Sequence, residues 1–200
     1  MQTSTAALQR RATRLAWFTV GWDAIEGILA VTIGVLAGSI ALIGFGIDSS
    51  IEVFAAGVVV WQLKRPDDEG RQALALRLIG STFFALAIYV SYEAIKDLVT
   101  QDRPDASILG IVLNIVPLAV MIPLARMKRD VGQRLGNRTV IADSAETRLS
   151  NYLSVSVLIG LGLNALFGWW WADPIAALII AGVAVNEGRE AWEREANDDV

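Results

Sequence analysis

Pairs of acidic residues stand inside the long apolar stretches of this chain, at spacings of three or four residues. Residues at these spacings lie on the same face of a helix. Two carboxylates held so close in a low-dielectric setting repel each other unless a cation binds between them or one of them holds a proton. Such pairs therefore favour a site that exchanges protons for a metal ion. The pairs are Asp23 with Glu26, Asp48 with Glu52, and Asp143 with Glu146.

The composition restricts the chemistry of such a site. The chain has 200 residues and contains neither cysteine nor histidine. Disulfides, thiolate ligands and imidazole ligands are therefore excluded, and any metal site must be built from oxygen atoms. Oxygen ligands favour harder ions, although Zn²⁺ also accepts carboxylates. The net charge of -4 says little about partners, but no basic face large enough for nucleic acid remains once the charges are assigned to loops. The sequence suggests no organic cofactor and no enzymatic activity.

Long apolar runs alternate with short charged clusters along the chain. Hydrophobic residues make up 54% of the sequence and charged residues only 19%. A helix needs about 20 apolar residues to cross the hydrocarbon core of a bilayer. We therefore predict an all-α integral membrane protein, a single transmembrane domain of six helices, with Asp173 as the N-cap of the last helix. The predicted spans are residues 15–36, 40–63, 74–95, 108–124, 140–167 and 174–192.

Lysine and arginine are unevenly distributed over the loops of this six-span arrangement. Of the 17 basic residues, fourteen fall on the side that holds both termini, with Lys128 assigned to the connection between the fourth and fifth spans. Only Lys96 and Arg103 fall on the other side, and Arg148 lies within the fifth span. Because cytoplasmic loops carry the excess of basic residues, we expect a multi-pass protein of the inner or plasma membrane with both termini in the cytoplasm.

A structural role is open for some of the charged groups inside the spans. Asp143 lies near the predicted start of the fifth helix, where a carboxylate stabilises the helix N-terminus. Arg148 is available to pair with an acid on another helix. Asp48 and Glu52 have the strongest claim to a functional role, because both lie deep in a long apolar run and ionisable groups there are costly.

Three segments resemble the cation diffusion facilitator family. Residues 38–52 contain Gly-Ser-Ile-Ala-Leu followed by Asp48 and Glu52, similar to the family's Gly-Ser-x-Ala-Leu stretch with two ligands four residues apart. Residues 142–151 resemble its Ala-Asp-x-x-His-x-x-x-Asp segment, and residues 171–181 resemble its Asp-Pro-x-x-x-x-Leu helix. The resemblance covers essentially the whole chain as a transmembrane domain. The family's usual cytoplasmic domain after the sixth span is expected to be missing.

The resemblance implies export of Zn²⁺, Mn²⁺ or Fe²⁺ against protons, by alternating access in a homodimer. Asp48 and Glu52 match the two ligands of the second span, and Glu146 matches the first ligand of the fifth, where His or Asp is usual. Ser150 stands where the family has a second acid. Either the site has three carboxylates, or a neighbour such as Asn151 or Glu26 takes the place of the missing acid, and we favour Glu26.

The predicted function is therefore transport of a divalent metal ion, with protons, the lipid bilayer and a second copy of the chain as partners. The alternative is a non-transporting membrane metal sensor or assembly protein that keeps the fold. A membrane-embedded enzyme ranks last, because no substrate-handling motif is present. The predicted metal-site residues are Asp48, Glu52, Glu146, Glu26, Asp23, Asp143, Ser150 and Asn151.

Overall fold

A computed structural model describes residues 2–37, 40–101 and 108–196 of the chain, and this part forms six helices without a strand. The all-α, six-helix prediction is thereby confirmed. A bundle of helices suits a bilayer, because each helix satisfies its own backbone hydrogen bonds where no water is present. The helices are α1 (Gln2–Ala37), α2 (Ile40–Leu63), α3 (Glu69–Thr100), α4 (Ile108–Leu135), α5 (Arg138–Phe167) and α6 (Ala172–Ala196).

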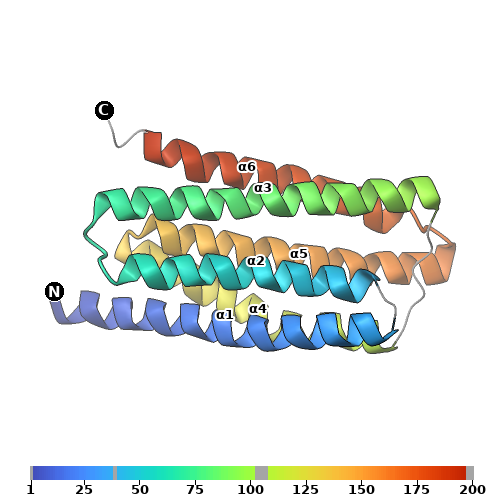
Figure 1. Cartoon of the computed structure of the whole chain (residues 1–200), viewed down its shortest axis with the longest axis horizontal. Helices are drawn as coiled ribbons and strands as arrows, with labels where there is room; N and C mark the ends of the chain where they lie inside the picture. The colour runs from blue at the N-terminus through green and yellow to red at the C-terminus, as the bar shows by residue number, and fades with distance from the viewer. Residues whose placement is uncertain (1, 38–39, 102–107, 197–200) are drawn as a thin grey trace.

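The helices run alternately up and down the long axis of the bundle. Both ends of the chain lie at the same end of the molecule as the α2–α3 and α4–α5 connections (Figure 1). The most extensive contacts join α1 with α2, α3 with α6, and α4 with α5. Helix α5 also contacts α2, α3 and α6, so it lies at the centre of the bundle. This position explains why residues of α5 meet side chains from so many other helices.

The bundle is apolar outside and partly polar inside. Large apolar side chains such as Ile28, Ile88 and Val99 are exposed on its surface, whereas Glu52, Lys128 and other charged or polar groups are buried. A water-soluble domain seldom buries charged residues in this way. By length and composition, segments Thr5–Ile33, Ile43–Leu63 and Glu69–Thr100 are apolar enough to cross a bilayer. The surface therefore suits lipid, and the multi-pass membrane prediction holds for this fold.

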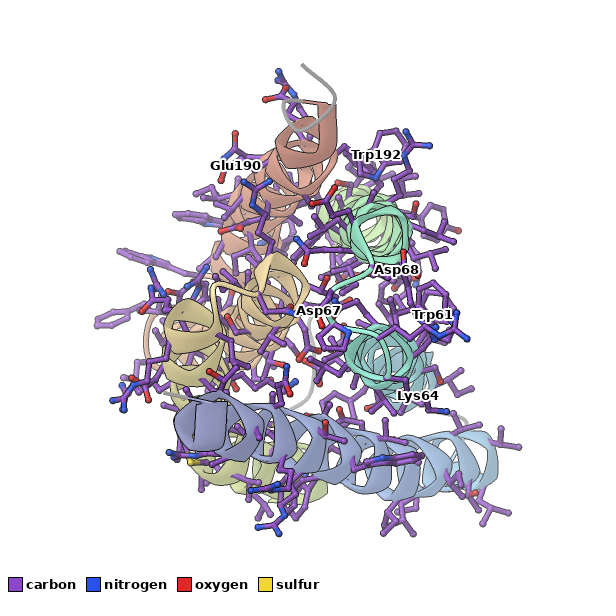
Figure 2. The ribbon with its side chains drawn as sticks, turned by 90° about the vertical axis from the view of Figure 1, so that its left-hand side faces the viewer. Trp61, Lys64, Asp67, Asp68, Glu190 and Trp192 are labelled. Carbon is purple, nitrogen blue, oxygen red and sulfur yellow. The ribbon has the colours of Figure 1, made fainter. Side chains whose placement is uncertain are left out.

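Side-chain hydrogen bonds fix several helix ends. The Asp68 carboxylate accepts from the backbone N–H of Arg71 at 3.0 Å and caps α3. The Trp61 ring centroid lies 4.0 Å from the Arg71 guanidinium, and Figure 2 labels both Trp61 and Asp68 in a view along the bundle. The Asn137 side chain caps α5 and donates to Gln62 Oε1 at 3.0 Å. This buried hydrogen bond ties the end of α2 to the start of α5.

The observed helices extend beyond the predicted spans at the end that holds both termini. Helix α1 begins at Gln2 rather than at residue 15, and α4 continues to Leu135 rather than ending at residue 124. Apolar composition marks only the part of a helix in lipid, and a helix continues into water wherever its backbone is supported. The last helix begins at Ala172, so Asp173 is not its N-cap as predicted. Its carboxylate instead accepts from the Ser156 hydroxyl at 3.1 Å.

Glycine lets α1 and α2 approach closely. A Cβ atom at Gly46 would overlap Cγ2 of Val31 and lie 3.0 Å from the Gly27 carbonyl oxygen. A Cβ atom at Gly27 would in turn lie 3.2 Å from Cβ of Ser49. Small residues at such crossings allow helix backbones to pack tightly in membranes. The crossing lies within two turns of the acidic residues of both helices and fixes how far apart they stand.

Candidate functional site

Asp23 of α1 and Glu52 of α2 lie against each other at the glycine-lined crossing. Both side chains are buried, with exposed fractions of 2% and 6%. Asp23 Oδ2 and Glu52 Oε1 have no hydrogen-bond partner. Two carboxyl groups in contact are stable only when they share a proton or a cation. This pair was not foreseen, because the sequence shows the spacing within a helix but not which acids face each other across two helices.

Asp48 of α2 is bound by Ser150 of α5. The Ser150 hydroxyl donates to Asp48 Oδ2 at 2.9 Å. The serine that stands where the resembling family has an acid therefore still faces the second-span acid. It supplies a neutral donor there instead of the second negative charge of the resembling family.

Glu146 of α5 is a fully enclosed acid without a partner. Its side chain is 1% exposed, and neither carboxylate oxygen has a hydrogen-bond partner. The hydroxyl of Thr82 lies beside it but donates to the carbonyl oxygen of Ile79 at 2.7 Å. A buried ionised carboxylate with no partner is strongly unfavourable. This position therefore calls for a proton or a cation.

Asp143 of α5 pairs with a buried lysine. Lys128 Nζ lies 2.9 Å from Asp143 Oδ2 and donates to the Thr147 hydroxyl at 3.1 Å. The assignment of Lys128 to the connection between α4 and α5 is therefore wrong, because α4 continues to Leu135 and turns this side chain inward. Asp143 is the sixth residue of α5 and is held by an ion pair rather than by the helix N-terminus.

The spacing of apolar residues around Lys128 could have predicted from the sequence that its side chain is buried. Leu124, Lys128 and Val131 are four and three residues apart, and all three are buried in the structure. Residues at these spacings share a helix face. Because its apolar neighbours on this face are buried in the bundle, Lys128 points into the protein as well.

Glu26 lies at the edge of the site. It is partly exposed, and it accepts a hydrogen bond from the indole N–H of Trp22, one turn earlier in α1. Its charge nevertheless acts on Asp23 and Asp48. Glu26 thus borders the other acids but already has a partner of its own, whereas Asp23 faces Glu52 directly.

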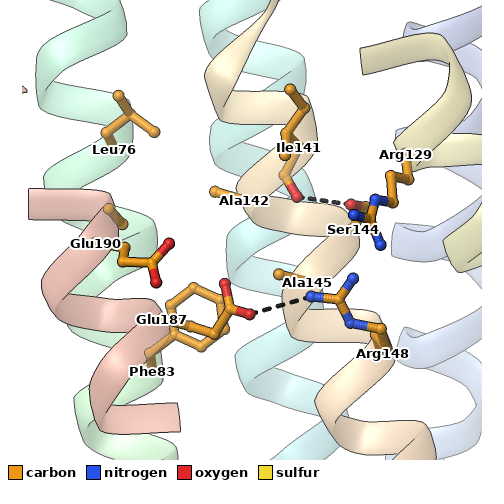
Figure 3. Close-up of a pocket in the computed structure, with 11 residues that line it drawn as sticks. Leu76, Phe83, Arg129, Ile141, Ala142, Ser144, Ala145, Arg148, Glu187 and Glu190 are labelled. Carbon is orange, nitrogen blue, oxygen red and sulfur yellow. Dashed lines mark hydrogen bonds and ion pairs between the residues drawn. The ribbon is translucent and has the colours of Figure 1, made fainter. Parts of the chain in front are cut away.

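The remaining predicted residue, Asn151, lines a cavity of about 300 Å³ between α4 and α5, together with Arg126 and Tyr152. An adjoining cavity of about 200 Å³ holds the pair of Arg148 and Glu187. Arg148 Nη2 lies 3.1 Å from Glu187 Oε1 of α6 (Figure 3). Arg148 therefore does pair with an acid on another helix, as the sequence allowed.

The buried acids form one electrostatic group around Lys128, which we call the carboxylate cluster. It draws on α1, α2 and α5 for its acids and on α4 for its single cation. Among the described residues, no three acids converge closely enough to hold one metal ion together. The cluster can therefore hold protons in this arrangement, and a shift of the helices is needed before several carboxylates share one ion. Its members are Asp23, Asp48, Glu52, Asp143, Glu146 and Lys128.

Comparison with known proteins relates the chain to transporters and to a magnetosome protein. An uncharacterized transporter of Synechocystis sp. is 28% identical over 76% of this chain and 51% of its own length. The magnetosome protein MamB of Magnetospira sp. is 26% identical over 94% of this chain and 67% of its own length. A cadmium, cobalt and zinc/H(+)-K(+) antiporter of Bacillus subtilis is 25% identical over 83% of this chain and 54% of its own length.

The chain thus spans about half of the length of two of these relatives and two thirds of the third. The sequence model of the cation efflux transmembrane domain matches residues 23–193, a range that contains all six helices in part or in full and every acid of the carboxylate cluster. The chain therefore belongs to the cation efflux, or cation diffusion facilitator, family.

Proposed function

We propose that this chain carries divalent metal ions across the bilayer in exchange for protons. The observation that supports the proposal most is the set of buried carboxylate oxygens without hydrogen-bond partners, on Asp23, Glu52 and Glu146. Such oxygens need a positive charge, and either protons or a metal ion supplies it. The name of the Bacillus subtilis relative, an antiporter of cadmium, cobalt and zinc, agrees with this exchange.

Asp48, Glu52 and Glu146 are the proposed metal ligands. Asp48 and Glu52 lie one turn apart on α2, and Glu146 approaches from α5. The contact between Asp23 and Glu52 favours Asp23 as the fourth ligand ahead of Glu26. Because all these ligands are oxygen atoms, Mn²⁺, Fe²⁺ and Zn²⁺ are the proposed ions, with the harder ions favoured.

The proposed cycle uses the same carboxylates in both states. Metal enters from the cytoplasm, displaces protons from Asp48, Glu52 and Glu146, and is released on the other side when the helices rock. Protons from that side then reload the acids. By analogy with the family we further propose a homodimer in the inner or plasma membrane with both termini in the cytoplasm.

Flux into proteoliposomes tests the proposal. Purified protein is reconstituted, and uptake of Mn²⁺, Fe²⁺, Zn²⁺ and Mg²⁺ is measured under a pH gradient. At least one transition ion should be transported by the wild type, and Asp48→Asn should reduce its rate at least about tenfold, because a ligand charge is lost. Absence of flux for every ion would exclude transport.

A second candidate is a metal sensor or assembly protein that binds ions without moving them. Two observations favour it: Ser150 supplies a neutral hydroxyl to Asp48, and the acids of the described segments do not converge on one ion. Metal binding without flux in the same vesicles would be the result that this candidate predicts.

A further inference from the structure

Lys128 places a positive charge among the acids of the proposed transport site. Its side chain is only 1% exposed, and it is the only lysine or arginine among the described residues that is buried. Its ammonium group binds Asp143 and Thr147. An ammonium has three N–H donors on a flexible stem and no acceptor. A cation at this depth is costly unless acids surround it.

The influence of this ammonium extends beyond Asp143. Its charge also acts on Asp23 of α1, Glu52 of α2 and Glu146 of α5. These are the acids whose oxygens have no hydrogen-bond partner. Lys128 of α4 therefore lies within electrostatic range of acids on α1, α2 and α5, and it stabilises negative charge at the positions where a metal ion would bind.

We propose that Lys128 is a tethered counter-ion that competes with the transported metal ion for the carboxylate cluster and so promotes its release. The inference rests on the proposed function and adds the residue that limits how tightly the ion is held. Without metal, the ammonium partly neutralises the cluster. With metal bound at Glu52 and Glu146, the two positive charges repel each other. A conducted ion must be bound firmly enough to enter the site but weakly enough to leave it.

A purely structural role makes a different prediction. If the ion pair only held α4 against α5, removal of either partner would loosen the bundle and weaken metal binding. As a competing cation, Lys128 weakens binding in the wild type, so its removal should strengthen binding. The two roles thus predict changes in metal affinity of opposite sign.

Binding of Zn²⁺ and Mn²⁺ to the purified full chain tests the inference by equilibrium dialysis. Lys128→Met should bind at least about tenfold more tightly than the wild type, since a nearby positive charge is lost. In vesicles, both its KM and its maximal rate should fall, because metal is held too firmly. Lys128→Arg keeps the positive charge and should therefore bind metal with the affinity of the wild type. Unchanged or weaker binding by a folded Lys128→Met protein would overturn the inference.

Two further variants keep the test decisive. Lys128→Met leaves Asp143 unpaired, so it is also made in an Asp143→Asn background, where removal of the lysine charge should again tighten binding at least about tenfold relative to Asp143→Asn alone. Glu52→Gln is measured in parallel. Wild-type binding by Glu52→Gln would contradict the proposed site itself. Loss of binding by Glu52→Gln together with no tightening in either lysine variant would overturn only the role of Lys128.

Discussion

The buried carboxyl group of Glu146 is expected to lower the stability of the protein. Both of its oxygens are buried without a hydrogen-bond partner. An ionised group in such a position costs free energy, and ionisable groups at membrane depth usually have a functional role. Glu146 is therefore expected to favour ion binding and, at the same time, to lower the stability of the ion-free protein.

Replacement of Glu146 tests this opposition. Glu146→Gln replaces an acid that must hold a proton or a cation with a neutral group of the same size, so the metal-free protein should have an equal or higher Tm. The same variant should lose metal flux at least about tenfold, since a ligand charge is gone. The matched control is Glu193→Gln, an exposed acid of α6, which should change neither quantity. A Tm well below that of the wild type would contradict the account of Glu146.

The Ser150–Asp48 hydrogen bond offers a second test. Ser150→Asp places a second carboxylate beside Asp48, so the variant should be less stable without metal but gain more Tm than the wild type when Mn²⁺ or Zn²⁺ is added. Ser150→Ala is the control, which loses the hydrogen bond, worth about 1 kcal/mol, without adding charge. If metal raises the Tm of Ser150→Asp no more than that of the wild type, position 150 does not face the ion.

Sequence alone identified the buried acids but not their partners. Asp48, Glu52 and Glu146 were recognisable because charges interrupt apolar runs at helical spacing. The contact of Asp23 with Glu52 and the pairing of Lys128 with Asp143 depend on how separate helices face each other. That information lies in packing between helices, which the spacing along one helix does not contain.

At the scale of helices, the close crossing of α1 and α2 sets the geometry of the site. Gly46 lies half a turn before Asp48, and a larger residue there would collide with Val31 and with the backbone of α1. The distance between Asp23 and Glu52 therefore depends on a position that carries no charge. We expect substitutions at this crossing to act on metal binding through that distance.

Gly46→Ala and Gly57→Ala form a matched pair that tests the crossing. A Cβ atom at Gly46 meets Val31 and the Gly27 carbonyl oxygen, so this variant should have a lower Tm and weaker metal binding. A Cβ atom at Gly57 meets nothing within 4 Å, so the same change there should leave the Tm unchanged or raise it, because alanine favours a helix. Equal effects of the two variants on Tm, measured by thermal unfolding in detergent, would argue against a tight crossing.

The number and order of the helices were predictable, but their ends were not. Apolar runs of sufficient length mark each helix, whereas hydropathy falls at the water interface even where the helix continues. Helix α4 illustrates the error: it runs to Leu135, and only Gly136 and Asn137 separate it from α5. The misassignment of Lys128 to a connection followed directly from this early predicted end.

At the scale of the whole molecule, the arrangement of the ends agrees with the distribution of basic residues. Both termini and the α2–α3 and α4–α5 connections gather at one end of the bundle, which the positive-inside rule assigns to the cytoplasm (Figure 1). The bundle also exposes apolar side chains to lipid and keeps its acids inside. This polarity is what a protein that moves ions through its interior requires.

Single cysteines test the orientation, because the chain has no cysteine of its own. Asp67→Cys lies in the α2–α3 connection and should react with a membrane-impermeant maleimide in intact cells only after permeabilisation. Thr100→Cys lies at the opposite end, at the last residue of α3, and should react without it. Labelling of Asp67→Cys in intact cells would reverse the proposed orientation.

The most direct test of the central claim is a count of the protons that leave when metal binds to the purified protein. In weakly buffered detergent solution, addition of Zn²⁺ or Mn²⁺ to the wild type should lower the pH in proportion to the metal bound, because the carboxylate cluster exchanges protons for the ion. Glu52→Gln should bind less metal and release fewer protons. Metal binding with no proton release, or release that Glu52→Gln leaves unchanged, would contradict the account.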